Sequence, residues 1–274
     1  MTGKMLIFGM GYSASRLAAQ LRSEGWEVVG TSRTASLAAI AFDDEVAVLN
    51  ALSDSSYILS SVPPLRVGGD PVLDRYGAAI AAAPANWIGY LSSTGVYGNT
   101  QGAWVDETAL TGSGRRSART TADLEWQQLR DDVRVFRLPG IYGPGRSALE
   151  RVREGKAHRI DLPDQIFSRV HVDDIVSGVI ASFSGPPGIY NLADDFPCSQ
   201  NAVIEFTSLL LDMEPPPLQT LEQAALSPMA AAFYAENRRI SNRKAKRVLG
   251  WHPQYRDYKQ GLMALFHSFG QNAD

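Results

Sequence analysis

The first 25 residues constrain the fold of this chain more than any other stretch. Met5–Phe8 is a short apolar run that ends at Gly9, and apolar residues then recur at helical spacing up to Gly25. This pattern predicts a buried strand, a tight turn and a helix. A second β-like run, Glu27–Thr31, follows at once. The stretch therefore predicts a β-α-β unit, which pairs two parallel strands.

Small residues occupy three fixed places in this turn, where Gly9, Gly11 and Ala14 form the pattern G-x-G-x-x-A. The first glycine allows the turn, the second lets the backbone approach a pyrophosphate, and a small third residue lets helix and strand pack closely. Free N–H groups at the helix N-terminus favour phosphate. We therefore interpret Gly9, Gly11, Tyr12 and Ala14 as a dinucleotide-binding turn. The alternative is a plain β-α-β turn without a ligand.

Composition argues against nucleic acid and membranes as partners. The chain has 274 residues, of which 45% are hydrophobic and 20% charged, and its net charge is −3 with no basic block. No apolar run approaches the roughly 20 residues of a membrane helix or suits a signal peptide. Cys198 is the only cysteine, which excludes a disulfide framework and a cysteine-based zinc site. We expect a cytoplasmic protein without a metal, as a monomer or homodimer.

Strand and helix patterns alternate over the first half of the chain. The further strands expected there include Tyr57–Val62, Trp87–Ser92 and Val133–Leu138. Such alternation is typical of an α/β fold with a doubly wound parallel sheet. The second half is richer in helix and proline. We expect a dinucleotide-binding core over residues 1–145 and a smaller, mainly substrate-binding lobe over 146–274, with residues around 167–192 returning to the core.

The end of the second strand bears on the choice of cofactor. Sites that prefer NAD place an acidic residue there for the ribose hydroxyls, whereas this chain has Ser32 and Arg33. A cation suits a 2′-phosphate, so the pair favours NADP over NAD. The alternative is a solvated surface arginine. Further along, Phe167–Asp174 predicts a strand end with an acidic helix cap, followed by a helix over Ile175–Phe183.

Six motifs follow one another along nearly the whole chain. They are GMGYSA from Gly9, YLSSTGVYG from Tyr90, RLPGIYGPGR from Arg137, RVHVDDI from Arg169, GIYNLADD from Gly188 and RRISNRKAKRVLGW from Arg238. Together they resemble the extended short-chain dehydrogenases/reductases of the NAD-dependent epimerase/dehydratase family, which have a Rossmann core. The resemblance implies a protein that binds NAD(P) and a small-molecule substrate, which in this family is by default a nucleotide-sugar.

The resemblance also implies roles for residues around the cofactor. Ser61 falls where the family lines the cofactor's ribose and pyrophosphate, and the segment that holds Pro139 and Ile141 resembles the one that packs against the nicotinamide. Thr94 matches the Ser/Thr that hydrogen-bonds the substrate. The alternative for Thr94 is a strand-end hydroxyl that bonds backbone. For His171, in the HVDD stretch at the base of the substrate lobe, a structural role is favoured.

The chain departs from the family at its catalytic pair. In the family a Tyr-x-x-x-Lys lies on the helix after the long loop, with a Glu four residues beyond the Lys. Setting Glu125 at that Glu puts Thr121 at the Lys and Ser117 at the Tyr. A serine hydroxyl is far less acidic than a phenol, and threonine brings no charge. No shift of register restores the pair, because residues 98–141 contain neither tyrosine nor lysine.

Two functional classes therefore stay open. One is an atypical reductase or epimerase with a substitute acid or base, for which Tyr97, Tyr142 and Asp106 are the candidates. The other is a non-catalytic NADP-binding sensor or scaffold. The long polar loop over residues 99–114 favours the enzyme.

Three arginines at the start of the same helix add a possible ligand contact. Arg115, Arg116 and Arg119 could bind an anionic substrate. They would be poor proton donors, because a guanidinium group stays protonated.

Overall fold

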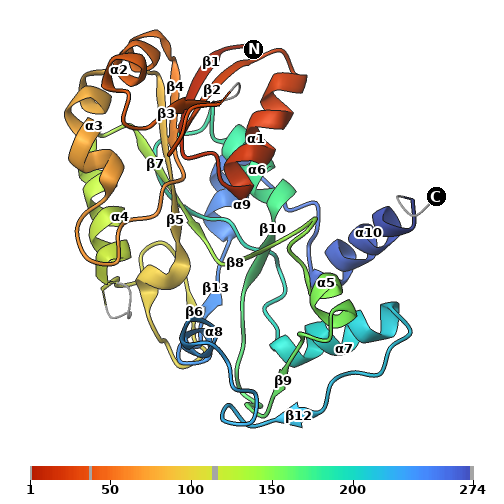
Figure 1. Cartoon of the computed structure of the whole chain (residues 1–274). Helices are drawn as coiled ribbons and strands as arrows, with labels where there is room; N and C mark the ends of the chain where they lie inside the picture. Colours follow the sequence, from red (N-terminus) through yellow and green to blue (C-terminus); the bar gives the residue numbers. More distant parts are fainter. Residues whose placement is uncertain (1, 37–38, 113–116, 272–274) are drawn as a thin grey trace.

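We describe the fold from a computed structural model that covers residues 2–36, 39–112 and 117–271 (Figure 1). A seven-stranded parallel sheet runs through it in the order β11-β7-β5-β4-β1-β2-β3. Its strands are β1 (Lys4–Phe8), β2 (Glu27–Ser32), β3 (Ala39–Ala41), β4 (Tyr57–Ser60), β5 (Trp87–Ser93), β7 (Val133–Leu138) and β11 (Gly188–Asn191). The strand order reverses beside β1, which confirms the predicted doubly wound α/β fold.

Helices cover both faces of this sheet (Figure 1). Those of the Rossmann-like body are α1 (Tyr12–Ser23), α2 (Glu45–Asp54), α3 (Pro71–Ala82), α4 (Ser117–Leu129) and α6 (Val172–Ala181). Alternate residues of β1 enter opposite cores. Met5 and Ile7 pack with residues of α1 and α6, whereas Leu6 and Phe8 pack with residues of α2, α3 and α4. After Lys4 the strand is apolar, because Met5–Phe8 is buried on both sides of the sheet.

The start of α6 differs from the prediction. The helix runs over Val172–Ala181 and not Ile175–Phe183, and its N-cap is His171 rather than an aspartate. The Nδ1 atom of His171 accepts a hydrogen bond from the backbone N–H of Asp173 at 3.2 Å. Histidine is not among the preferred cap residues, so the sequence pattern did not mark this start.

The second half of the chain adds a smaller region at the carboxyl end of the sheet (Figure 1). Its helices are α5 (Ala148–Arg153), α7 (Gln200–Leu210), α8 (Pro228–Phe233) and α10 (Tyr258–Gln271), whereas α9 (Arg243–Leu249) packs beside α6 and β11 of the sheet-bearing body. Residues of α5, α7 and α10 share one apolar cluster. The division of the chain at residue 145 stays a prediction.

Short parallel strand pairs lie outside the main sheet; the first two join residues from before and after residue 145, and the last lies wholly after it. They are β6 (Trp104–Val105) with β13 (Arg239–Ile240), β8 (Gly140–Tyr142) with β10 (Arg169–His171), and β9 (Arg159–Ile160) with β12 (Leu218–Gln219). A single turn of 3₁₀ helix, η1 (Thr94–Tyr97), follows β5. Within the described ranges, no helix is long and apolar enough to cross a membrane.

Candidate functional site

The turn after β1 is held on both sides by hydroxyl groups. Gly9 has a φ of +82°, and a Cβ there would lie 2.8 Å from Cγ2 of Val62, so the position requires glycine. The Gly9 N–H donates to Oγ1 of Thr31 at 3.1 Å, and the Ser61 hydroxyl donates to the Gly9 carbonyl at 2.6 Å. The ends of β1, β2 and β4 are thus fixed together where the strand order reverses, which is where such sheets bind ligands.

The N-terminus of α1 opens onto empty space. Gly11 is its N-cap, and no side chain caps the first turn. A Cβ on Gly11 would meet nothing within 4 Å, whereas Ala14, one turn on, is fully buried against the sheet. The first N–H groups of a helix lack partners within the helix and carry partial positive charge. The open backbone at Gly11 therefore fits a phosphate group.

Tyr12 joins α1 to the loop after β8. Its hydroxyl donates to the Pro144 carbonyl at 3.0 Å, and the Arg146 guanidinium lies 5.6 Å from its ring centroid. The loop is thereby held over the start of α1. The two residues expected beside the nicotinamide, Pro139 and Ile141, lie just before this loop, and both are half-buried.

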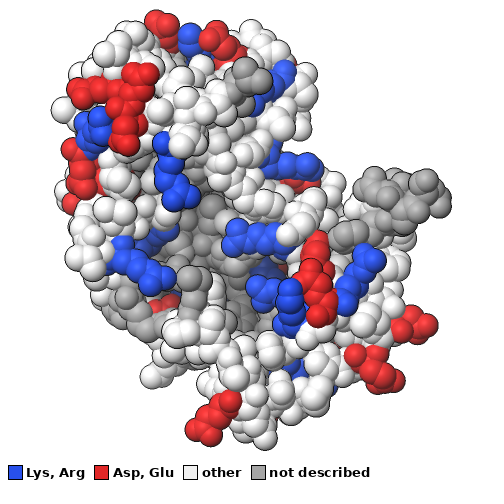
Figure 2. Space-filling view, in the orientation of Figure 1, with Lys and Arg blue, Asp and Glu red and all other residues white. Residues whose placement is uncertain are grey.

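The end of β2 presents a cation. The Ser32 hydroxyl donates to the Thr34 carbonyl, while Arg33 is exposed and forms no ion pair with another described residue. Figure 2 shows a hollow in the middle of this face, with Lys and Arg side chains around its rim. The surroundings of the hollow therefore suit an anionic ligand.

Ser93 ends β5 and Thr94 begins η1, and the surroundings of the two hydroxyl groups differ. Thr94 is 4% exposed, and its Oγ1 lies 3.5 Å from the Leu138 carbonyl. This is the structural alternative weighed for Thr94 from the sequence. Ser93 is only half-buried, and its Oγ accepts a hydrogen bond from the Gly95 N–H at 3.1 Å. Its own proton has no acceptor among the described residues and could be donated to a ligand. The sequence did not single out Ser93, because neighbouring hydroxyls look alike until the strand faces are known.

Tyr97 belongs to a buried polar network. Its hydroxyl donates to Oδ1 of Asn191 at 2.8 Å and accepts from Nη1 of Arg137 at 3.1 Å. Arg137 also forms a bidentate ion pair with Asp123 of α4, at 2.7 and 3.1 Å, and the Ser92 hydroxyl donates to the same carboxylate at 2.5 Å. Tyr97 is 1% exposed, and burial raises the pKa of its hydroxyl. This position favours a structural role.

The two other candidate acid/base groups are also poorly placed. Tyr142 is 9% exposed, its hydroxyl has no hydrogen-bond partner among the described residues, and burial raises its pKa well above the ordinary value. Asp106 accepts two hydrogen bonds from Thr108, at 2.6 and 2.9 Å, and these lower the pKa of Asp106. An aspartate that stays ionised cannot donate a proton at neutral pH.

The residues of α4 that face the sheet are not those of the register that sets Glu125 at the family's glutamate. Ser117, Thr121 and Glu125 are all exposed, and the pKa of Glu125 is raised, first by partial burial and then by the charge of Asp74 on α3. The structure therefore does not support setting Glu125 at the family's glutamate. The acidic residue of α4 that faces the sheet is Asp123, which is 1% exposed. Arg115 and Arg116 lie outside the described residues.

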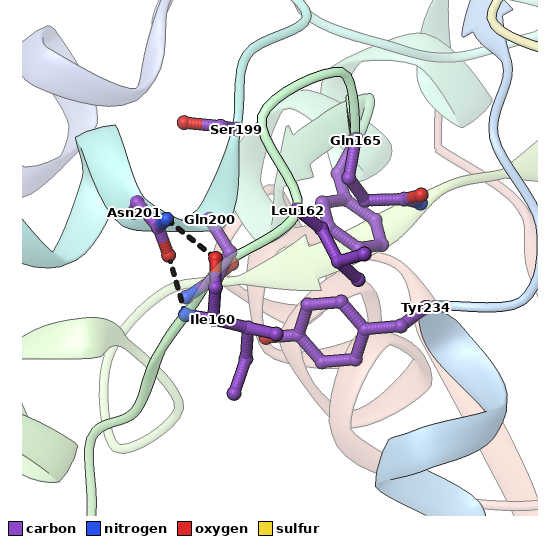
Figure 3. A pocket seen from close by; sticks show the side chains of 8 residues that line it. Ile160, Leu162, Gln165, Ser199, Gln200, Asn201 and Tyr234 are labelled. Carbon is purple, nitrogen blue, oxygen red and sulfur yellow. Dashed lines mark hydrogen bonds between the residues drawn. The ribbon is translucent and has the colours of Figure 1, made fainter. Parts of the chain in front are cut away.

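A small pocket lies in the C-terminal region, and Figure 3 shows its lining. Asn201 faces the backbone of Ile160 there, accepting from its N–H at 2.9 Å and donating to its carbonyl at 2.7 Å. The cavity volume is about 10 Å³, far below the roughly 300–1,000 Å³ of small-molecule sites. No cluster of three or more His, Cys, Asp or Glu side chains in the described part of the chain could hold a metal ion.

Solved structures resemble this fold over nearly their whole length. A conserved protein of unknown function from Silicibacter pomeroyi DSS is 39% identical, with 97% of this chain and 99% of that one covered and a TM-score of 0.89. MoeE5, in complex with UDP-glucose and NAD, is 21% identical, with 99% and 100% covered and a TM-score of 0.77. The human epimerase family protein SDR39U1, with NADPH, is 15% identical, with 96% and 99% covered and a TM-score of 0.79.

The chain has the fold of the extended short-chain dehydrogenases/reductases. It belongs to one family with the Silicibacter pomeroyi protein. No family model matches the sequence. A curated protein, the 3-diazoavenalumate denitrifying reductase of Streptomyces sp, is 29% identical over 163 residues, which is 53% of this chain. The match spans 52%, about half, of that reductase. In this extended short-chain dehydrogenase/reductase fold, the Gly9–Ala14 turn and the hollow lie at the expected ligand-binding edge.

Proposed function

We propose that this chain binds NADP(H) across the carboxyl edge of its sheet. The observation that carries the proposal is the open backbone at Gly11, at the N-terminus of α1, beside a Gly9 turn that is fixed to β2 and β4. Gly11 and the first turn of α1 would hold the pyrophosphate, with Ser61 next to it. Arg33 would bind the 2′-phosphate, since no acidic residue competes for that place. Structural neighbours that hold NAD and NADPH support a nicotinamide cofactor.

The reaction that suits this site best is reduction rather than epimerisation. The cofactor, when bound, supplies a hydride, and that transfer itself requires no acid–base group. Epimerisation at a hydroxyl-bearing carbon also needs a base. Of the three candidates, Tyr97 and Tyr142 are buried with raised pKa values, which leaves only the exposed carboxylate of Asp106. The half-buried Ser93 hydroxyl could donate a hydrogen bond to the substrate in place of Thr94. We therefore propose an NADP(H)-dependent reductase of a small electrophile that needs little acid catalysis.

The curated relative supports the proposal of a reductase, because its name describes a reductase that acts on a diazo compound. MoeE5 binds UDP-glucose, and a nucleotide-sugar remains the alternative substrate class for this chain.

The test is a turnover assay with wild type and Ser93→Ala. Purified protein is mixed with NADPH and a panel of aryl diazonium salts, quinones, iminium ions and simple aldehydes, and separately with UDP-glucose and catalytic NAD⁺. We expect NADPH oxidation with the more reactive electrophiles, and no epimer of UDP-glucose. Ser93→Ala should slow the reduction of the aldehydes about tenfold or more. It should leave the rates of reduction of the diazonium and iminium ions nearly unchanged. Epimerised sugar would contradict the proposal, and NADPH binding without any turnover would identify a non-catalytic protein.

A further inference from the structure

The buried Asp123–Arg137 pair defines which positions of α4 face the ligand site. Residues four apart lie on one face of a helix, so Arg119 lies on the same face as Asp123, one turn nearer the N-terminus. The surroundings of both side chains agree. Asp123 bonds Ser92 of β5 at 2.5 Å, and Nη1 of Arg119 donates to the Tyr90 hydroxyl of the same strand at 3.0 Å. Arg119 therefore holds the position four residues before the sheet-facing carboxylate, where the Glu125 register had put Thr121.

The guanidinium of Arg119 lacks an acidic partner. It is half-buried, and it forms no ion pair with a carboxylate of the described residues. Asp70 is near enough for the Arg119 charge to lower its pKa, but burial raises that pKa more strongly. The Asp70 carboxylate accepts hydrogen bonds from the Trp126 indole at 3.0 Å and from the Val72 and Leu73 N–H groups at 2.9 and 3.2 Å. Among the described residues, the Asp70 carboxylate therefore accepts hydrogen bonds from these three groups and not from Arg119.

Tyr90 keeps Arg119 in place without neutralising it. The Tyr90 ring is fully buried and stacks on Trp126, with centroids 5.1 Å apart and planes 10° apart. One hydrogen on Nη1 of Arg119 is thereby donated to the Tyr90 hydroxyl, whose position is fixed by this packing. The other donors of the planar guanidinium group form no hydrogen bond with a described residue, and Arg119 lies in the first turn of α4. A partly buried cation without a counter-ion is costly, and a bidentate carboxylate is the group that matches a guanidinium fork.

We propose that Arg119 binds a carboxylate of the substrate. This inference rests on the proposed function only for the place of the substrate, beside the bound cofactor. Because a guanidinium stays protonated, Arg119 selects and orients an anion and transfers no proton. The substrate class is then an organic acid whose electrophilic centre lies apart from its carboxylate.

The experiment measures binding rather than turnover. Wild type, Arg119→Met, Arg119→Lys and the exposed control Arg247→Met are each saturated with NADP⁺. They are then titrated in a calorimeter with acetate, benzoate and cinnamate, and with the neutral matches benzamide and cinnamamide. We expect at least one acid to bind wild type and Arg247→Met about tenfold or more tightly than its amide. Arg119→Met should lose this preference, and Arg119→Lys should keep part of it, because it keeps the charge without the fork.

Two results would overturn the inference. One is that no acid binds wild type at concentrations up to about 10 mM, a range that covers millimolar affinities. The other is a preference for the acid that survives in Arg119→Met. The same titrations separate this inference from the proposed function. If NADP⁺ does not bind but the acids still need Arg119, the cofactor proposal fails and the anion site stands. Thermal unfolding of each variant shows that the fold is kept.

Discussion

Asp123 of α4 and Arg137 of β7 form a bidentate ion pair, at 2.7 and 3.1 Å, inside the protein, where neither side chain is more than 2% exposed. The pair attaches α4 to the strand next to β5. It also joins the Ser92 and Tyr97 hydroxyls into one network at the carboxyl edge of the sheet. Desolvation opposes the charge on Arg137, but the hydrogen bonds and charge of Asp123 outweigh it and raise the pKa of Arg137.

Breaking this pair should destabilise the fold strongly. In Arg137→Met the Asp123 carboxylate stays buried without its counter-ion, which costs about 3–5 kcal/mol in comparable sites. The matched control is Arg75→Met, whose ion pair with Asp43 is largely exposed and should contribute about 1 kcal/mol or less. Urea unfolding of both variants checks this. A loss below about 1 kcal/mol for Arg137→Met would mean that the network relaxes around the lone carboxylate.

The cap of α6 should make stability depend on pH. His171 is 1% exposed, and burial lowers its pKa from 6.5 to about 4, with Asp173 opposing and Arg16 adding to the shift. A depressed histidine pKa contributes stability that is complete above pH 6.5 and is lost as the pH falls through about 4. The shift corresponds to about 3 kcal/mol, at about 1.4 kcal/mol per pH unit.

His171→Asn separates this effect from the rest of acid unfolding. Asparagine still caps the helix but does not titrate in this range. The free energy of unfolding, measured between pH 7 and pH 4, should fall less steeply in the variant than in wild type. Parallel curves would show that His171 is protonated as easily in the folded state as in the unfolded state.

The sequence predicted the sheet and the turn after β1 because their signals are local. Gly9, Gly11 and Ala14 stand at spacings that the turn itself requires, and apolar strands mark a sheet buried on both faces. Which side of α4 packs against the sheet could not be predicted in this way. Asp123 and Glu125 are both acidic and only two residues apart, and only the position of Arg137 in the folded chain distinguishes them.

Burial determines which of the remaining candidate residues can contact a ligand. Tyr97 and Tyr142 carry the chemistry of an acid/base, but tertiary packing encloses both hydroxyls. Ser93 and Thr94 carry the same chemistry, and the end of β5 leaves one partly exposed and buries the other. The sequence could name these groups as candidates. It could not predict which of them are exposed to a ligand, because exposure depends on contacts between distant segments.

The choice of cofactor should depend on Arg33. A charge-assisted hydrogen bond is worth about 1.5–3 kcal/mol, so Arg33→Ala should weaken NADP⁺ binding about tenfold or more and leave NAD⁺ binding unchanged. Calorimetric titration of both dinucleotides into both proteins checks this, and NAD⁺ serves as the internal control. Equal affinity of wild type for the two cofactors, unaffected by the substitution, would make Arg33 a solvated surface residue.

The most direct test of the account is NADPH binding to wild type and to Gly11→Val. The added Cβ meets nothing within 4 Å in the free protein, so the fold should be kept, with a modest fall in melting temperature because valine is a poorer N-cap than glycine. A bound pyrophosphate needs that same space. We predict that NADPH stabilises wild type in thermal unfolding, and that Gly11→Val melts at the same temperature with and without NADPH. Undiminished stabilisation of Gly11→Val by NADPH would contradict the account, because the dinucleotide would then bind away from this turn.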